Sequence, residues 1–118
     1  MSVAEVCSRE VVVAYPHEPV RTAARLMRQH HVGDVILVED RGGRRFPIGI
    51  VTDRDLVIEA VERDVDVDAV TLGEFVTQPM VAVREADALE DAIHRMRQRG
   101  AHRVPVVDDE GALVGVLS

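Results

Sequence analysis

Apolar residues form two kinds of pattern along the chain, short continuous runs and series at helical spacing. Short, nearly continuous apolar runs are typical of strands that are covered on both faces. They predict strands at 11–14, 35–38, 48–51, 81–83, 104–107 and 113–117. Apolar residues at helical spacing over 20–27 and 89–96 predict two helices, the second with Asp87 as its N-cap. A third helix is expected over 53–63, and a short helical turn over 72–76.

The order of these elements recurs because the sequence contains an internal repeat. Residues 5–40 align with 74–109 without a gap, nine of the 36 pairs are identical, and the tripeptide Met-Arg-Gln recurs intact. After a three-residue insertion in the first copy, 49–52 aligns with 115–118. Each copy is therefore predicted to be a β-α-β-β-α unit. One copy is too small to bury its sheet alone, so we expect an α/β (α+β) fold with both copies in one domain.

The repeat also sets the expected boundaries. We place repeat 1 at 3–64, an acidic linker at 65–73 and repeat 2 at 74–118. The first copy continues past Thr52 into a helix, whereas the second copy ends at the equivalent position, Ser118. We therefore expect a truncated second repeat, whose last helix is missing here and present in the natural protein.

Composition restricts the classes of function. With 47% apolar and 30% charged residues, the sequence has the balance of a soluble globular protein. The formal net charge of −7 argues against binding to nucleic acid or to an anionic membrane surface. No apolar run is long enough to span a bilayer, and the N-terminus does not have the pattern of a signal peptide, so a cytoplasmic protein is expected. The single cysteine excludes an internal disulfide.

Two segments carry a resemblance to a known family. They are Gly-Ile-Val-Thr-Asp-Arg-Asp at 49–55 and Gly-Ala-His-Arg-Val-Pro-Val-Val-Asp at 100–108, with the opening segments 5–8 and 74–77 also in agreement. In this pattern and spacing, the chain resembles a tandem pair of cystathionine-β-synthase (CBS) domains, a Bateman module. The resemblance implies two repeats packed sheet to sheet about a pseudo-twofold axis. It also implies two clefts that bind adenosine-containing ligands, in a sensor and not in an enzyme.

The first cleft takes its ribose motif from residues 49–55. The family pattern matches Gly49, Thr52 and Asp55, and Ile50 and Asp53 lie within it. The Asp55 carboxylate can accept hydrogen bonds from both ribose hydroxyls, with the Thr52 hydroxyl and the helix start facing the phosphate. The alternative is that Thr52 or Asp53 is only a helix N-cap.

Other residues of the clefts follow from the resemblance alone. Adenine is expected against Met80 and Val81, and phosphate near His102 and Arg103, because an arginine fork binds phosphate oxygens. Arg103 has an alternative role, a salt bridge to a carboxylate such as Asp34. The second cleft is expected to use Arg103 together with a further set of residues. That set is Ser8, Val12, Val116 and Ser118. The ribose aspartate of this cleft would lie beyond Ser118.

These features favour a regulatory module that binds AMP, ADP or ATP. Two alternatives stay open: a ligand-free dimerisation module that pairs through the apolar helix at 56–61, and a binder of another adenosyl ligand such as S-adenosylmethionine or a dinucleotide. We find no catalytic constellation, and the five histidines lack metal-binding spacing. The expected partners are a second copy of the chain and an enzyme or transporter regulated in trans.

Overall fold

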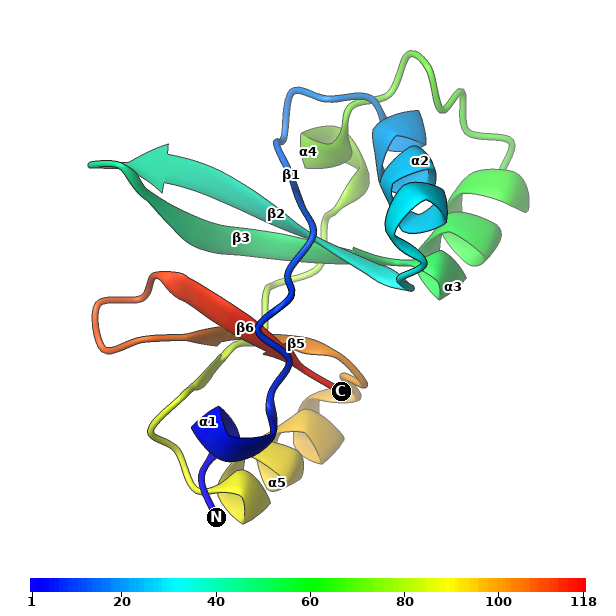
Figure 1. Cartoon of the computed structure of the whole chain (residues 1–118). Helices are drawn as coiled ribbons and strands as arrows, with labels where there is room; N and C mark the ends of the chain where they lie inside the picture. The colour runs from blue at the N-terminus through cyan, green and yellow to red at the C-terminus, as the bar shows by residue number, and fades with distance from the viewer. The chain divides into compact units, whose positions relative to one another are not determined.

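The computed structural model describes all 118 residues, which divide into two spatial units. The first-repeat unit contains residues 12–39 and 48–79, and the second-repeat unit contains 1–11, 40–47 and 80–118. Each unit has its own three-stranded sheet, helices and apolar core (Figure 1). The mixed α+β class with one sheet for each repeat is confirmed.

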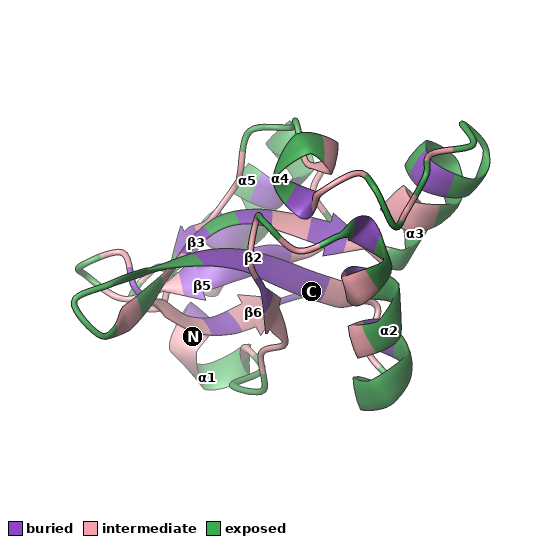
Figure 2. Ribbon diagram, turned by 90° about the horizontal axis from the view of Figure 1, so that it is seen from above, coloured by how far each residue is buried: buried purple, intermediate pink, exposed green.

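The first-repeat unit is built on the sheet β1-β2-β3. Its strands are β1 (Val13–Ala14), β2 (Asp34–Arg41) and β3 (Arg44–Thr52), and β1 is parallel to β2. Two helices accompany this sheet, α2 (Val20–His30) and the short α4 (Leu72–Phe75). The middle of β2 is fully buried, as Figure 2 shows in purple.

Leu72 joins α4 to the core of the first-repeat unit. Its side chain is fully buried in the cluster formed by α2 and the sheet, together with Val20 and Met27. The Leu72 N–H also donates to the Glu18 carbonyl at 2.8 Å. In the loop that leads to α4, an ion pair with Arg21 lowers the pKa of Asp68.

The chain after β3 begins an α-helix and then widens to π-helical winding. α3 (Asp53–Asp55) continues directly into η1 (Leu56–Val61). The wider winding is seen in the Glu62 N–H, which donates to the carbonyl of Val57, five residues earlier. A helix was predicted over 53–63, so the element is confirmed but its winding was not anticipated. Such π-helical turns are often found at functional sites.

The second-repeat unit repeats this plan. Its strands are β4 (Val83–Arg84), β5 (Val104–Val107) and β6 (Leu113–Leu117); β4 is parallel to β5, and β5 is antiparallel to β6. The helices α1 (Val3–Val6) and α5 (Leu89–Arg99) lie beside this sheet (Figure 1).

Helix α1 stands first in the chain but packs in the second-repeat unit. Val3 is fully buried in the core of β4–β6, and Ser2 and Ser8 form isolated bridges to Ala88 and Val116. In the repeat alignment Val3 corresponds to Leu72 of α4, which packs in the first-repeat unit. Helix α1, which precedes the first repeat's strands, therefore completes the core of the second-repeat unit. Helix α4, which precedes the second repeat's strands, completes the core of the first-repeat unit.

The tip of the β2–β3 hairpin also belongs to the second-repeat unit. Arg44 forms ion pairs with Asp108 and, at 2.6 Å, with Glu110 in the β5–β6 connection. Partial desolvation raises the pKa of Asp108, but the N–H groups of Ala112 and Glu110 and the Arg44 guanidinium outweigh it, so the pKa is lowered. The Arg41 guanidinium lies 3.9 Å from the centre of the Phe46 ring. Ion pairs thus join the tip to the β5–β6 connection, and a cation–π contact stabilises the tip itself.

Three sequence predictions differ from the structure in detail. The strands expected at 11–14 and 81–83 are only two residues long, Val13–Ala14 and Val83–Arg84. Asp87 does not cap α5: Ala88 is the N-cap, and the Asp87 carboxylate accepts a hydrogen bond from the Arg84 N–H at 2.8 Å.

None of the helices has the length and apolar character needed to cross a bilayer.

Candidate functional site

Thr52 and Asp55 are joined by two reciprocal hydrogen bonds where β3 ends and α3 begins. The Asp55 N–H donates to Thr52 Oγ1 at 3.1 Å, and the Thr52 N–H donates to Asp55 Oδ2 at 2.9 Å. This capping box holds both side chains at the helix start. Thr52 is therefore an N-cap, as the alternative interpretation expected. Capping uses a lone pair of Oγ1 and the oxygen Oδ2, so the Thr52 hydroxyl proton and Asp55 Oδ1 remain for another partner.

The backbone at this helix start has no free donors in its first turn. The Asp53 N–H donates to the Gly33 carbonyl at 3.0 Å, and the Arg54 N–H donates to Asp53 Oδ1 at 2.9 Å. The Asp55 N–H is bound by Thr52, as described above. Helix starts bind phosphate through unsatisfied N–H groups. The expectation that this helix start faces a phosphate is therefore not supported by the structure, because those groups already have partners.

Gly49 and Ile50 precede Thr52 on β3, and the close packing at Gly49 requires a residue without a side chain. A Cβ at Gly49 would lie 3.0 Å from Cγ1 of Val76, closer than nine in ten real contacts. Its repeat counterpart Gly115 is tighter still, because a Cβ there would lie 2.7 Å from the Ser8 carbonyl oxygen. Gly49 therefore allows the segment around Val76 to approach β3 closely, and Gly115 allows the segment around Ser8 to approach β6. Ile50 is half-buried beside Gly49.

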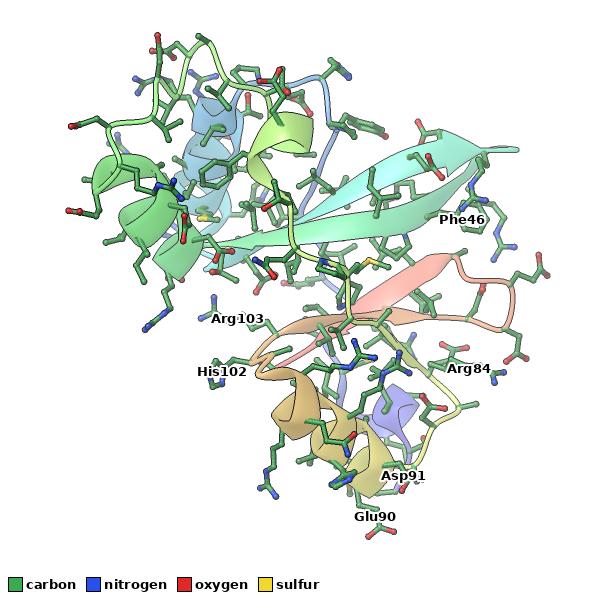
Figure 3. All side chains as sticks on the ribbon, turned by 180° about the vertical axis from the view of Figure 1, so that it is seen from behind. Phe46, Arg84, Glu90, Asp91, His102 and Arg103 are labelled. Carbon is green, nitrogen blue, oxygen red and sulfur yellow. The ribbon has the colours of Figure 1, made fainter.

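The residues predicted for adenine and phosphate belong to the second-repeat unit. Met80 and Val81 are half-buried just before β4, and Val81 packs on the core of that unit. His102 is exposed and Arg103 is half-buried, and both lie in the loop between α5 and β5 (Figure 3). Residues 49–55 therefore lie together in the first-repeat unit, and the four residues predicted for adenine and phosphate all belong to the second-repeat unit.

The residues predicted for the second cleft are divided in the same way. Ser8 and Val116 are paired through two backbone hydrogen bonds of 2.9 Å in the second-repeat unit. Val12 belongs to the first-repeat unit. Ser118 is exposed at the end of β6 and lines a pocket that also includes His102.

This pocket has a volume of about 450 Å³ and lies entirely within the second-repeat unit. Its lining is largely apolar and comes from three stretches of the chain. The lining residues are Val6, Leu89, Ile93, Met96, Arg97, Ala101, His102, Leu117 and Ser118. Leu89 and Met96 were predicted only as part of one apolar helix face, and no pattern in the sequence indicated that Val6 lies beside them. No group of three or more histidine, cysteine, aspartate or glutamate side chains gathers in a way that could hold a metal ion.

The family model of the CBS domain matches residues 3–62 and 72–118, so nearly all of the chain is accounted for by two copies. The chain belongs to the CBS domain family and contains a tandem pair of these domains. It is 36% identical over 118 residues to an uncharacterized protein from Methanopyrus kandleri, covering all of this chain and 59% of that protein. It is 31% identical to the CBS domain-containing protein YhcV from Bacillus subtilis, covering 99% of this chain and 79% of YhcV.

Solved structures share the fold over the whole chain. A CBS domain protein from Pyrobaculum aerophilum, solved in complex with AMP, has a TM-score of 0.88 and 26% identity, and the match covers 100% of this chain and 87% of that one. Hypoxic Response Protein I, solved with two coordinated zinc ions, has a TM-score of 0.84 and 25% identity, and the match covers 100% of this chain and 92% of that one. A sequence relative named hypoxic response protein 1, from Mycobacterium tuberculosis, is 29% identical over 86% of this chain and 68% of its own length.

Proposed function

We propose that this chain is a regulatory module that binds an adenine nucleotide, AMP, ADP or ATP, and not an enzyme. The observation that carries the proposal is the arrangement of Thr52 and Asp55. The capping box fixes a hydroxyl donor and a carboxylate acceptor next to each other at the helix start. A ribose offers two neighbouring hydroxyls, and a carboxylate oxygen such as Asp55 Oδ1 can accept from them. Because the capping bonds hold both side chains in place, little rotamer entropy is lost on binding.

We further propose that the remaining predicted residues complete this site and a second one. Met80 and Val81 would contact the adenine of the first ligand, and His102 and Arg103 its phosphate. Since the amides of α3 are already bonded, phosphate recognition depends on such cations. A second site would use Ser8, Val12, Val116 and Ser118. The choice of an adenine nucleotide is supported by the relative of 26% identity that was solved with AMP.

Regulation requires that the ligand distinguish two states of the protein. A bound nucleotide can shift the equilibrium between two packings only by its differential affinity for them. We propose that the responding partner is an enzyme or transporter encoded separately, or another part of a longer protein. The chain spans 59% of its M. kandleri relative, which leaves room for further segments in that protein.

Isothermal titration calorimetry with AMP tests the proposal. We expect saturable heat with AMP, weaker heat with ribose 5-phosphate, which lacks the base, and weaker heat with inosine monophosphate, which lacks the exocyclic amine. A thermal-shift assay with the same three compounds gives an independent measure, because a ligand that binds only the folded state raises Tm. If millimolar AMP, ADP and ATP all produce neither heat nor a rise in Tm, the function proposed above is wrong.

A further inference from the structure

The tip of the β2–β3 hairpin is rich in arginine. It carries Arg41, Arg44 and Arg45, and it belongs to the second-repeat unit. Gly42 and Gly43 form the turn with φ values of 58° and 79°, as is typical of tight β-hairpin turns. A Cβ at either glycine would meet no atom within 4 Å. The arginine tip is therefore open to solvent at its turn.

The equivalent connection in the second repeat has the opposite charge. In the repeat alignment, the β2–β3 connection corresponds to the connection between β5 and β6, and the three-residue insertion of the first copy falls within it. Asp108, Asp109 and Glu110 follow β5 directly, and residues 104–113 contain no cation. We call this segment the acidic turn. The arginine tip and the acidic turn belong to the same unit and have complementary charge.

The acidic turn occupies the arginine tip in this structure. Arg44 pairs with Asp108 and, at 2.6 Å, with Glu110, so that one guanidinium binds two carboxylates. A Cβ at Gly111 would lie 3.8 Å from the ring of Phe46, so the glycine is placed against that ring. The contact thus shows what the tip recognises: two carboxylates separated by one residue and followed by a glycine.

These internal contacts are exposed and can be replaced. The side chains of Arg44 and Glu110 are 40% and 76% exposed. Exposed ion pairs contribute little to stability, because water screens the charges. Arg45 is also exposed and takes part in none of the ion pairs of its unit. A carboxylate from another molecule can therefore bind Arg45 and replace Glu110 on Arg44.

We propose that the arginine tip is a docking element for an acidic turn of a partner protein, and that Asp108 and Glu110 occupy it while the partner is absent. The internal contact is autoinhibitory, because a partner has to replace these carboxylates to reach Arg44. A nucleic acid fits the tip less well than a protein does. The Arg41 guanidinium already stacks on the Phe46 ring at 3.9 Å, where a base would stack. The carboxylates beside Arg44 also repel a chain of phosphates.

Fluorescence anisotropy with a labelled peptide tests the docking on the full chain. The probe is fluorescein-labelled Val-Val-Asp-Asp-Glu-Gly-Ala-Leu, the sequence of residues 106–113. The double variant Asp108→Asn with Glu110→Gln vacates the tip. Asp108→Asn keeps Oδ1, which accepts from the N–H groups of Glu110 and Ala112, and replaces Oδ2, which pairs with Arg44. The turn should keep its fold, which thermal unfolding will verify. The peptide should bind this variant about tenfold or more tightly than the wild type, because no internal group competes.

Two controls identify the residues that bind the peptide. Glu90→Gln with Asp91→Asn neutralises two exposed carboxylates in the first turn of α5, which Figure 3 shows away from Phe46. This control raises the net charge by the same amount as the double variant and should bind the peptide as the wild type does. Adding Arg44→Gln and Arg45→Gln to the double variant should abolish the gain in affinity.

The same assay distinguishes a protein partner from a nucleic acid. A labelled oligothymidylate of similar length should bind the double variant more weakly than the peptide does, and tighter binding would overturn the choice of a protein partner. The docking proposal is overturned if the double variant binds the peptide no better than the wild type, or if the gain survives the loss of both arginines. None of these results depends on the nucleotide site.

Discussion

Substitutions at Thr52 and Asp55 can separate the capping role of these residues from the proposed ligand role. Thr52→Val removes the acceptor of the Asp55 N–H and keeps the shape of the side chain. Loss of an N-cap acceptor costs about 1 kcal/mol. For a chain of this size that corresponds to a fall in Tm of roughly 3–5 °C. Asp55→Asn keeps an oxygen that can accept from the Thr52 N–H, so its Tm should fall less.

The effect on ligand affinity should have the opposite order. Asp55→Asn replaces a charged acceptor by a neutral one, and a hydrogen bond to a charged group contributes about 1.5–3 kcal/mol. Its Kd for AMP should therefore rise about 10-fold or more, even though its stability changes little. Thr52→Val should raise Kd less, because the carboxylate that accepts from the ribose is still present.

The assays are thermal unfolding and calorimetric titration with AMP on the same protein samples. Glu59→Gln provides a matched control: it also neutralises one carboxylate near the start of this helix, but at an exposed position paired with Arg63. It should change neither Kd nor Tm appreciably, since an exposed pair contributes at most about 1 kcal/mol. If Asp55→Asn binds AMP with the wild-type Kd, the ribose role of Asp55 is refuted. If Thr52→Val leaves Tm unchanged, the capping argument is wrong.

Four further results are expected. Gly115→Ala places a Cβ 2.7 Å from a backbone carbonyl oxygen and should lower stability by about 1–3 kcal/mol, measured by chemical denaturation. Arg44→Ala should increase hydrogen exchange in the hairpin tip at 40–47, because its ion pairs with Asp108 and Glu110 are removed. The lowered pKa values of Asp68 and Asp108 stabilise the fold above the unfolded-state value of about 4, so Tm should fall as pH drops below about 4 and stay constant near neutrality. Arg103→Gln should weaken AMP and leave adenosine affinity unchanged in titrations of both ligands.

Local patterns in the sequence predicted the elements because both the patterns and the elements are local. Apolar runs identified the strands, and the contiguous segment 49–55 identified the helix start with Thr52 and Asp55. The cap of α5 was predicted incorrectly for a physical reason. Asp87 is a good capping residue, but its carboxylate binds the nearby Arg84 N–H, as short acidic side chains often do in turns.

Features that depend on distant segments could not be predicted in this way. Val3 is an ordinary apolar residue in the sequence and belongs to repeat 1. It is nevertheless buried in the core of the second-repeat unit, among residues that come much later in the chain. The pocket beside α5 combines Val6 with residues near 90, 100 and 117, which no single motif connects. The internal repeat does contain a usable signal, because Val3 aligns with Leu72 and both open a short buried helix.

The distribution of charge favours ribose, and not phosphate, as the group that Thr52 and Asp55 bind. The helix start at Thr52 has two neighbouring carboxylates, Asp53 and Asp55, and its first-turn amides are already bonded. A phosphate at that point would face repulsion without compensating donors, whereas ribose hydroxyls can donate to a carboxylate. The cations that a phosphate needs are concentrated instead at the end of α5, around Arg103.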